Sequence, residues 1–259
     1  MIFRSLLVLM LLFYSELFAE SKTEIKIEAG IFMPNIDGSI ENVHGSSDFQ
    51  NDYVYSDATA SYFAADLKLP YKYAPNVMVK YFYMQENANS TLDKNVTVAD
   101  GFFNSKVSTV TDFAVLNTIL YKDFKQKGKI ISLLGRKVYS GDFEFDVGLN
   151  VKVLMWNFEI IDQINLSKSP SWIHVQEFIP LPYIGFKYHL YRFSLFADAS
   201  ALSFVEAKAF DYQVGASFRV VSRLSLSGSY VYEKFKAVEK LDTVNFTTSG
   251  YKFSFIYTF

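Results

Sequence analysis

Three histidines are the only side chains of this sequence that normally titrate near neutral pH, and the sequence contains no cysteine. Without a thiol, disulfides, thiol catalysis, thiolate metal sites and a lipidated N-terminal cysteine are excluded. A catalytic histidine needs a positioned partner, and His174 with Glu177 is the one grouping of this kind. A solvated loop histidine is the simpler interpretation of the segment 171–177. With His44 and His189 far away in the sequence, no histidine metal site is predicted.

Charged residues that recur at every second position form a larger group of candidates. In the segment 143–156, Glu144, Asp146 and Lys152 alternate with apolar side chains and therefore share one face of an extended chain. The same alternation places further charged residues on the corresponding face of other segments, namely Lys187, Asp198, Asp211, Arg219, Glu233 and Lys252. These charged residues are our candidate site, and their chemistry depends on what that face encloses.

The C-terminal segment indicates what the two faces meet. One face carries only large aromatic residues, which are Tyr251, Phe253, Phe255, Tyr257 and Phe259. The other face is small, polar or charged except at Ile256. This pattern is typical of a membrane-spanning β-strand with lipid on one face and a polar lumen on the other. The alternative is a strand of a soluble sandwich, but a solvated sheet would not carry five successive large residues on one face.

Similar alternation occurs in nine earlier segments, which are 23–33, 61–69, 77–85, 112–122, 143–156, 182–190, 193–202, 210–220 and 224–235. Each is about ten residues long, as a tilted strand needs to cross the hydrocarbon core of a membrane. Only the segment 112–122 alternates too poorly for its facing to be assigned. The predicted fold class is all-β, a transmembrane antiparallel up-and-down barrel of about ten strands, with eight to twelve possible.

The N-terminal segment predicts export. An arginine at position 4 precedes an apolar run from Leu6 to Tyr14, and Ala19 follows as a small residue. This order is that of a secretory signal peptide, and the run is too short to span a bilayer. We therefore predict a signal peptide over residues 1–19 and one barrel domain over 20–259, exported through the periplasm to a bacterial outer membrane.

Inside a barrel of this size, the charged face would line a narrow lumen. Its signs are nearly balanced, so we expect the charges to pair into a salt-bridged plug, with Glu144 and Asp146 opposite His189 and Lys187. Asp211 and Glu233 are expected to face each other, where they would attract a cation or hold a proton. The simpler interpretation is two hydrated carboxylates beside Lys208 and Lys234.

The connections alternate in length, with long loops predicted over 34–59, 86–111 and 157–181 and tight turns at the other end. Long outer loops and short periplasmic turns are typical of bacterial barrels, and both termini then lie in the periplasm. The segment 123–142 departs from this pattern. It predicts either a short amphipathic helix at the membrane surface or an extension of the two flanking strands.

The chain resembles the small outer-membrane β-barrel proteins of Campylobacter- and Helicobacter-type proteobacteria. The resemblance is carried by Glu28-Ala-Gly-Ile-Phe-Met-Pro34, Asp146-Val-Gly-Leu-Asn-Val-Lys-Val153 and Tyr251-Lys-Phe-Ser-Phe-Ile-Tyr-Thr-Phe259. It implies location and architecture, and carries over no catalytic or ligand residues. An ending of this kind also implies that Phe255, Tyr257 and Phe259 form the signal read by the barrel-assembly machinery.

The predicted function is non-enzymatic, as a structural or surface-exposed protein or as a narrow conduit with a charge-paired lumen. The alternative is an outer-membrane protease or lipid deacylase with a site at the extracellular rim. Ten-stranded proteases of this membrane use an Asp-x-His motif, which does not occur here. Lipid deacylases place Ser or Asn two residues from His, and His44, with Asn42 and Ser46, is the one histidine that has such neighbours. Expected partners are outer-membrane lipid, lipopolysaccharide and the assembly machinery. No cofactor is predicted, and no basic stripe suggests nucleic acid.

Overall fold

The computed structural model describes residues 23–42, 45–53, 58–71, 74–99, 101–133, 136–165, 169–203, 208–239 and 242–259. The predicted signal peptide and His44 lie outside these residues. Within the described ranges, no helix is long and apolar enough to cross a membrane.

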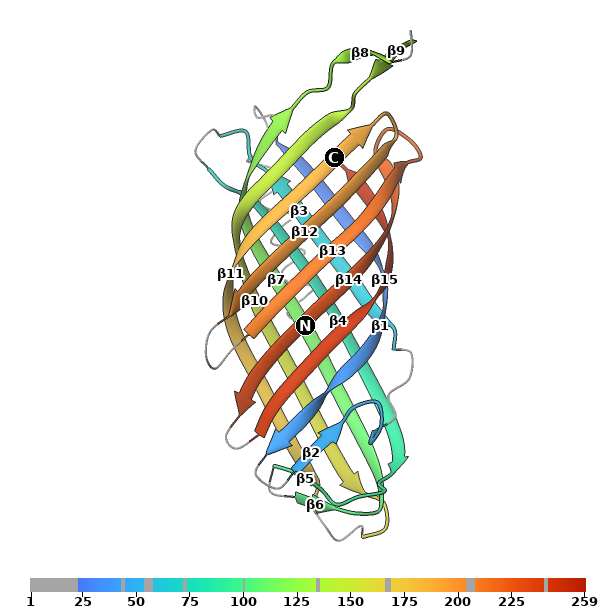
Figure 1. Cartoon of the computed structure of the whole chain (residues 1–259), viewed down its shortest axis with the longest axis vertical. Coiled ribbons are helices and arrows are strands. Elements are labelled where there is room, and N and C mark those ends of the chain that lie inside the picture. The colour runs from blue at the N-terminus through green and yellow to red at the C-terminus, as the bar shows by residue number, and fades with distance from the viewer. Residues whose placement is uncertain are drawn as a thin grey trace.

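Ten long strands form a closed antiparallel barrel (Figure 1). In their order around the barrel they are β1 (Glu24–Asn42), β3 (Ala60–Lys68), β4 (Asn76–Thr91), β7 (Lys106–Gln126), β10 (Asp142–Asp162), β11 (Ser171–Leu190), β12 (Phe193–Ser203), β13 (Lys208–Arg219), β14 (Leu224–Glu239) and β15 (Asp242–Thr258). The barrel closes where β15 pairs with β1, from Lys26 opposite Thr258 to Glu41 opposite Thr243. The predicted fold class is confirmed.

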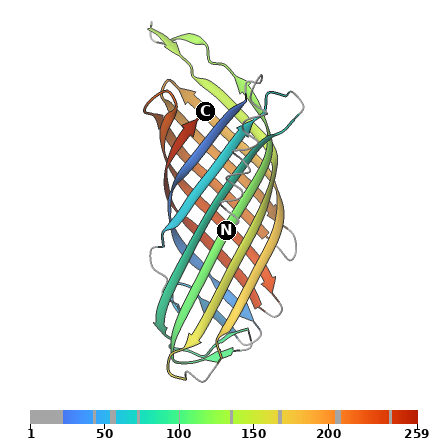
Figure 2. The ribbon, with the colours of Figure 1, turned by 180° about the vertical axis from the view of Figure 1, so that it is seen from behind.

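Short strands lie at both ends of the barrel. We call the end where β1 begins and β15 finishes the terminal end, and the opposite end the tower end. The tower end carries β2 (Gly45–Asp48) and the hairpin of β5 (Val96–Val98) and β6 (Gly101–Phe103), whereas β8 (Ile130–Leu133) and β9 (Arg136–Tyr139) project from the terminal end (Figure 1). Seen from behind, the same two groups lie at opposite ends of the tilted strands (Figure 2).

The segment 123–142 therefore extends the flanking strands as a hairpin, and the alternative of a surface helix is wrong. Ile130 pairs with Tyr139, and the Ser140 amide donates to the Lys129 carbonyl at 2.9 Å. Gly141 closes the base of the hairpin with a φ of +76°, a conformation that glycine adopts without steric cost. Paired strands satisfy the backbone polar groups of this segment without a helix.

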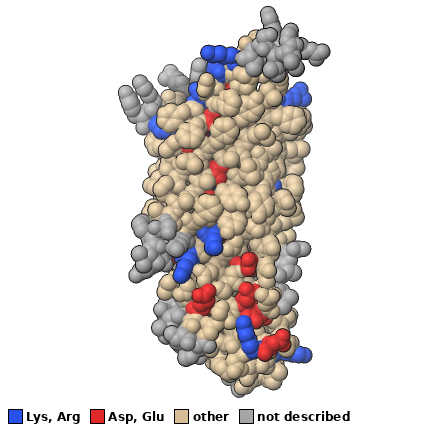
Figure 3. Space-filling model, in the orientation of Figure 1, with Lys and Arg blue, Asp and Glu red and all other residues tan. Residues whose placement is uncertain are grey.

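The outer surface of the barrel carries an apolar belt. Its large exposed side chains alternate along the strands, for example Phe143, Phe145, Val147 and Leu149 on β10 and Tyr251, Phe253, Phe255 and Tyr257 on β15. With a rise of about 3.3 Å per residue and a tilt of about 45°, the lipid-facing part of β10, from Phe143 to Met155, covers roughly 28 Å. Figure 3 shows this middle region as mostly uncharged. The belt therefore matches the thickness of a membrane.

Several strands continue well beyond the belt at the tower end. β7 and β10 are 21 residues long and β11 is 20, so much of the predicted loops 86–111 and 157–181 is strand. In this region the alternation changes phase: Trp156 and Phe158 are buried inside, while Asn157 is exposed outside. The change occurs because the outer face now meets water. The predicted strand lengths of about ten residues were wrong here, because the prediction ended each strand where the alternation changed.

The facing of β7, which the sequence left open, is decided by its neighbours. Leu120 pairs with Leu149 on the outward face, whereas Ile119 pairs with Asn150 and is buried. Odd-numbered residues of β7 therefore point into the lumen.

Candidate functional site

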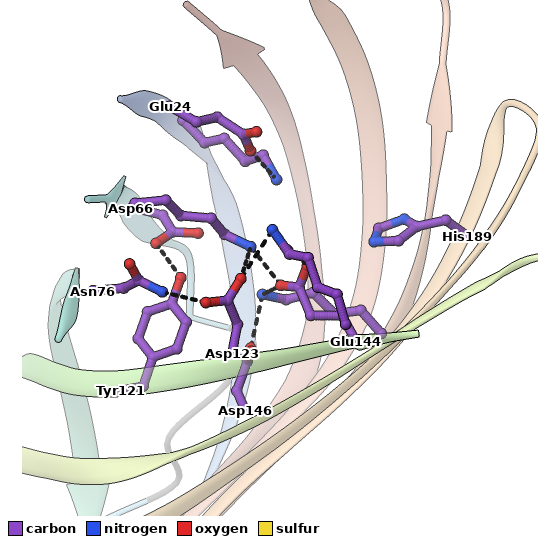
Figure 4. A network of polar contacts seen from close by, with 12 residues as sticks. Glu24, Asp66, Asn76, Tyr121, Asp123, Glu144, Asp146 and His189 are labelled. Atoms are coloured by element: carbon purple, nitrogen blue, oxygen red, sulfur yellow. Dashed lines mark hydrogen bonds and ion pairs between the residues drawn. The ribbon is translucent and has the colours of Figure 1, made fainter. Parts of the chain in front are cut away.

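Several charged residues meet inside the terminal half of the barrel (Figure 4). Lys187 on β11 lies 2.9 Å from the Asp146 carboxylate and 3.2 Å from that of Glu144, both on the neighbouring strand β10. Lys68 on β3 reaches Glu144 at 2.5 Å and Asp123 at 3.7 Å. Glu144 therefore joins two lysines that come from strands on either side of it. We call this set, with Lys125 at its edge, the ion-pair layer.

The predicted partner His189 is not part of this layer. In the register of β10 and β11, His189 lies opposite Asp142, while Glu144 lies opposite Lys187. The His189 ring instead contacts the Ser194 hydroxyl, with 2.7 Å between Nδ1 and Oγ. Figure 4 shows the imidazole apart from the ion pairs. The expected contact between this histidine and Glu144 or Asp146 was therefore wrong, because Lys187 occupies both carboxylates and His189 bonds to its cross-strand neighbour Ser194.

A second group of charges lies in the middle of the lumen. Lys152, whose side chain is 3% exposed, extends from β10 to Asp211 on β13 at 2.7 Å and to Glu233 on β14 at 3.5 Å. Asp211 and Glu233 are cross-strand neighbours, as expected. They are not hydrated carboxylates beside Lys208 and Lys234, because Glu233 is buried and Lys234 lies on the opposite, exposed face. The cation that they attract is the ammonium group of Lys152.

Two further pairs lie near this group. Lys80 on β4 contacts Asp198 on β12 at 2.7 Å. Lys252 contacts Glu28 at 2.8 Å, and its ammonium lies 3.8 Å from the ring centroid of Tyr62. Burying an ammonium group is costly without a carboxylate or an aromatic face beside it, and Lys252 has both.

Of the predicted cluster, the structure leaves Arg219 apart. Arg219 is exposed at the terminal end, where it lines the mouth of a cavity of about 710 Å³. One wall of this cavity carries paired charges, and the opposite wall carries small hydroxyl side chains, including Ser194, Ser217, Ser225 and Thr258. The small side chains leave the space that larger residues would fill.

From this cavity toward the tower end, the lumen narrows. Beside Lys80, Asp211 and Glu233, a second cavity measures only about 30 Å³, the space of roughly one water molecule. Beyond it, the lumen is filled by buried aromatic rings that we call the aromatic plug: Phe49, Tyr53, Phe113, Trp156, Phe158, Phe235 and Phe246.

The aromatic plug joins segments from around the barrel. Phe49 follows β2 and packs edge-on against Trp156 and Phe246, each with 5.7 Å between ring centroids. The Phe113 and Phe246 centroids are 4.6 Å apart. Offset and edge-on aromatic packing of this kind stabilises a core beyond the burial of area alone. The plug was not predicted from the sequence, although the exchange of polar and apolar faces at Trp156 and Phe158 is a signal for it.

At the terminal end, outside the lipid-facing belt, Asp142 anchors the β8–β9 hairpin. Its carboxylate accepts hydrogen bonds from the Tyr139 hydroxyl at 2.5 Å and the Gly128 amide at 2.8 Å. The Tyr139 hydrogen bond, followed by that of Gly128, lowers the pKa of Asp142 from its ordinary value. The same contact raises the pKa of Tyr139.

No protein-family model matches the sequence, and no curated protein matches it. Among solved structures, the chain is similar to the outer membrane protease OmpT from Escherichia coli, at 9% identity and a TM-score of 0.51, over 91% of this chain and 97% of that one. The NalP autotransporter translocator domain from Neisseria meningitidis matches at 11% identity and 0.44, over 98% and 95%. Ail of Yersinia pestis matches at 9% and 0.37, over 92% and 99%.

The chain has the fold of an outer-membrane β-barrel. The OmpT likeness shows this fold alone, and the apolar belt gives a physical reason for the same location. A closed barrel leaves no strand edge unpaired, which is what a β-sheet needs to lie in lipid. The predicted outer-membrane location is confirmed on these grounds.

His174 and Glu177, the one pair that the sequence suggested for catalysis, lie on opposite faces of β11. His174 is exposed on the outer face of β11, whereas Glu177 is three residues away and belongs to the inward-facing set. The His174 ring contacts the side chain of Asn157, a neutral amide. In the described part of the chain, no group of three or more His, Asp or Glu residues is placed to hold a metal ion.

Proposed function

We propose that this protein is a non-enzymatic, surface-exposed structural barrel of the outer membrane with a closed lumen. The observation that carries the proposal is the aromatic plug. Trp156 and Phe49 are fully buried within the tower end, and packed rings in this position would block the passage of a solute. The ion-pair layer, nearer the terminal end, is consistent with this role, because its lysines and carboxylates form ion pairs with one another.

The proposed orientation places the tower outside the cell. Both ends of the strand path, Glu24 and Thr258, lie at the terminal end, where the turn at 191–192 is also short. Short turns and chain termini belong to the periplasmic side of bacterial barrels. The strand segments beyond the belt then form a rigid platform above the membrane, with Trp172 67% exposed. A rigid platform of this kind suits a protein that contacts other molecules outside the cell better than one that conducts a solute.

Single-channel recording in planar bilayers tests the closed lumen. The wild-type barrel should show no steady conductance, and the triple substitution Phe49→Ala, Trp156→Ala and Phe246→Ala should produce one. Trp172→Ala with Phe178→Ala is the matched control, because both of these large side chains are exposed. A large steady conductance of the wild type would overturn the proposal in favour of the narrow conduit.

The hydrolase alternative is tested separately with peptide substrates and with lipid A deacylation assays on the refolded barrel. We expect no turnover above a denatured control. Turnover that is lost in His174→Ala or His189→Ala would overturn the non-enzymatic assignment.

A further inference from the structure

The cavity of about 710 Å³ at the terminal end is large enough to hold a small molecule. It extends along β13 from Arg219 at its mouth to Gln213 at its floor. With about 3.3 Å per residue and a tilt of about 45°, these two positions are roughly 14 Å apart along the barrel axis. Sites for small molecules measure about 300–1,000 Å³ and are largely preformed. We call this space the terminal cavity.

The mouth of the terminal cavity carries an excess of positive charge. Every described carboxylate that lines the cavity has a partner, which is a lysine for Glu24, Glu28, Glu144 and Asp198 and a tyrosine hydroxyl for Asp66 and Asp142. At the mouth, Asp142 alone lacks a lysine partner, and Lys127 is near enough to offset its charge. Arg219 lines the mouth without an ion pair to a described residue, and Arg192 and Arg223 are exposed in the adjacent turns. These arginines would attract an anion.

Arg219 lies among hydroxyl groups that complete a site for this anion. Ser225 lies opposite Arg219 on β14, and the Arg219 amide donates to the Arg192 carbonyl at 2.8 Å, which fixes the end of its strand. The side-chain hydroxyls of Ser217, Ser225 and Thr258 line the cavity and form no hydrogen bond with a described residue. A guanidinium group binds a carboxylate or phosphate through two parallel hydrogen bonds, and hydroxyls donate to its other oxygens.

The ring of Phe196 lies on the same wall, between the mouth and the floor. Phe196 is the cross-strand neighbour of Gly215, and a Cβ at Gly215 would lie 2.7 Å from the Phe196 Cζ atom. The ring therefore covers the backbone of β13 and presents an apolar surface to the terminal cavity. An aromatic ring beside several hydroxyls suits a sugar, because sugar C–H groups pack on the ring while sugar hydroxyls form hydrogen bonds.

At the floor, the Tyr62 hydroxyl is buried and has no hydrogen-bond partner among the described residues. Tyr62 is 8% exposed, and it lines both the terminal cavity and the small cavity of about 30 Å³ beyond it. A buried hydroxyl without a partner is costly, so an oxygen atom that a ligand brings to this depth would accept its hydrogen bond. Lys80 and Asp198 line the same floor and add further polar atoms. The floor, like the mouth, therefore suits a polar ligand.

We propose that the terminal cavity binds a saccharide that carries a carboxylate or phosphate group. The anionic group binds Arg219 at the mouth, the sugar packs on Phe196 along the hydroxyl wall, and a ligand oxygen accepts a hydrogen bond from Tyr62. Because the mouth and the floor lie far apart, a disaccharide is needed to reach both. This inference goes beyond the proposed function and rests on it only for the orientation, which places the mouth in the periplasm.

Isothermal titration calorimetry of the refolded barrel in neutral detergent tests the site with cellobiouronic acid, cellobiose 6-phosphate and cellobiose. At least one anionic disaccharide should bind roughly tenfold more tightly than cellobiose, and the tighter of the two identifies the anionic group. Arg219→Gln should weaken its binding roughly tenfold, because a hydrogen bond between two charged groups is lost. Arg223→Gln is the matched control, because Arg223 is exposed and does not line the cavity. Its exposed charge is screened by salt, so the affinity should change by less than about twofold.

Tyr62→Phe tests whether the ligand reaches the floor. It removes a hydroxyl without a described partner, so the unfolding midpoint should not fall, whereas the affinity should weaken roughly fivefold. Absence of binding by both anionic disaccharides, equal binding of cellobiose, or unchanged affinity in Arg219→Gln would overturn the site. Conductance of the wild type in planar bilayers tests the closed lumen independently, so failure of the site and failure of the proposed function are distinguishable.

Discussion

Lys152 and Asp211 lie 2.7 Å apart inside the barrel, although two strands, β11 and β12, separate the strands that carry them. The lysine side chain therefore crosses the lumen and ties two parts of the wall together. Lys80 and Asp198 do the same between β4 and β12. Charges that would be costly alone in this interior are compensated by residues distant in sequence.

Lys152→Met should destabilise the barrel strongly, by about 3–5 kcal/mol, because Asp211 and Glu233 lose their buried cation. Urea unfolding in lipid vesicles measures the change. Adding Asp211→Asn and Glu233→Gln should recover much of the stability, since no uncompensated charge then remains. Lys106→Met, at an exposed position, is the control. A triple variant no more stable than Lys152→Met would contradict compensation as the cause.

Replacing Glu144 and Asp146 together by Ala should lower the free energy of unfolding without opening the barrel. Lys68 and Lys187 lose their main carboxylates, but the aromatic plug lies elsewhere in the lumen. Planar-bilayer recordings should therefore stay closed for this variant. If it conducts like the variant without plug aromatics, the ion-pair layer would be the actual barrier.

Leu149→Arg should cost ~2–4 kcal/mol, because Leu149 faces lipid near the middle of the belt. Ser217→Arg should cost less, because Ser217 faces the 710 Å³ cavity. Asn150 is unsuitable as the inward control, because its side chain is 1% exposed and donates hydrogen bonds to Asn117 and Ser200, so an arginine there would disrupt packing. Reversible unfolding of both variants measures the difference, and a lower cost for Leu149→Arg than for Ser217→Arg would contradict a lipid-facing Leu149.

Phe259→Asp should reduce the amount of protein in the outer membrane far more than it reduces stability in vitro. Phe259 is 50% exposed and contacts Tyr257 at 4.8 Å, so few core contacts depend on it. The ratio of membrane abundance to refolded stability checks this expectation, with Phe253→Asp as a comparison within the belt. Wild-type abundance of Phe259→Asp would refute a signal in the terminal residues.

The base of the β8–β9 hairpin should weaken in acid. The hydrogen bonds from Tyr139 and Gly128 lower the pKa of Asp142 below 3.8, so their contribution is present above that pH and is lost as the pH falls through the folded-state pKa. An NMR titration of the Asp142 carboxyl carbon measures the midpoint. Tyr139→Phe should move it back toward 3.8, and a wild-type midpoint above 3.8 would contradict the argument.

The sequence alone determined the barrel and the facing of most of its strands. Period-two alternation in segments such as 143–156 requires one face in lipid and one in a polar interior, and the structure has both. The resemblance to the barrels of Campylobacter- and Helicobacter-type bacteria stays a prediction. So do the signal peptide and the assembly signal.

Only the tertiary structure decided which charges pair and where the lumen closes. Cross-lumen partners such as Lys152 and Asp211 depend on the register accumulated over several strands, which local alternation does not specify. The aromatic plug was hidden because Trp156 and Phe158 follow the opposite phase from Phe143 and Phe145. A strand that leaves lipid for water exchanges its polar and apolar faces, and the phase change at Trp156 can be interpreted in this way only when the depth of the apolar belt is known.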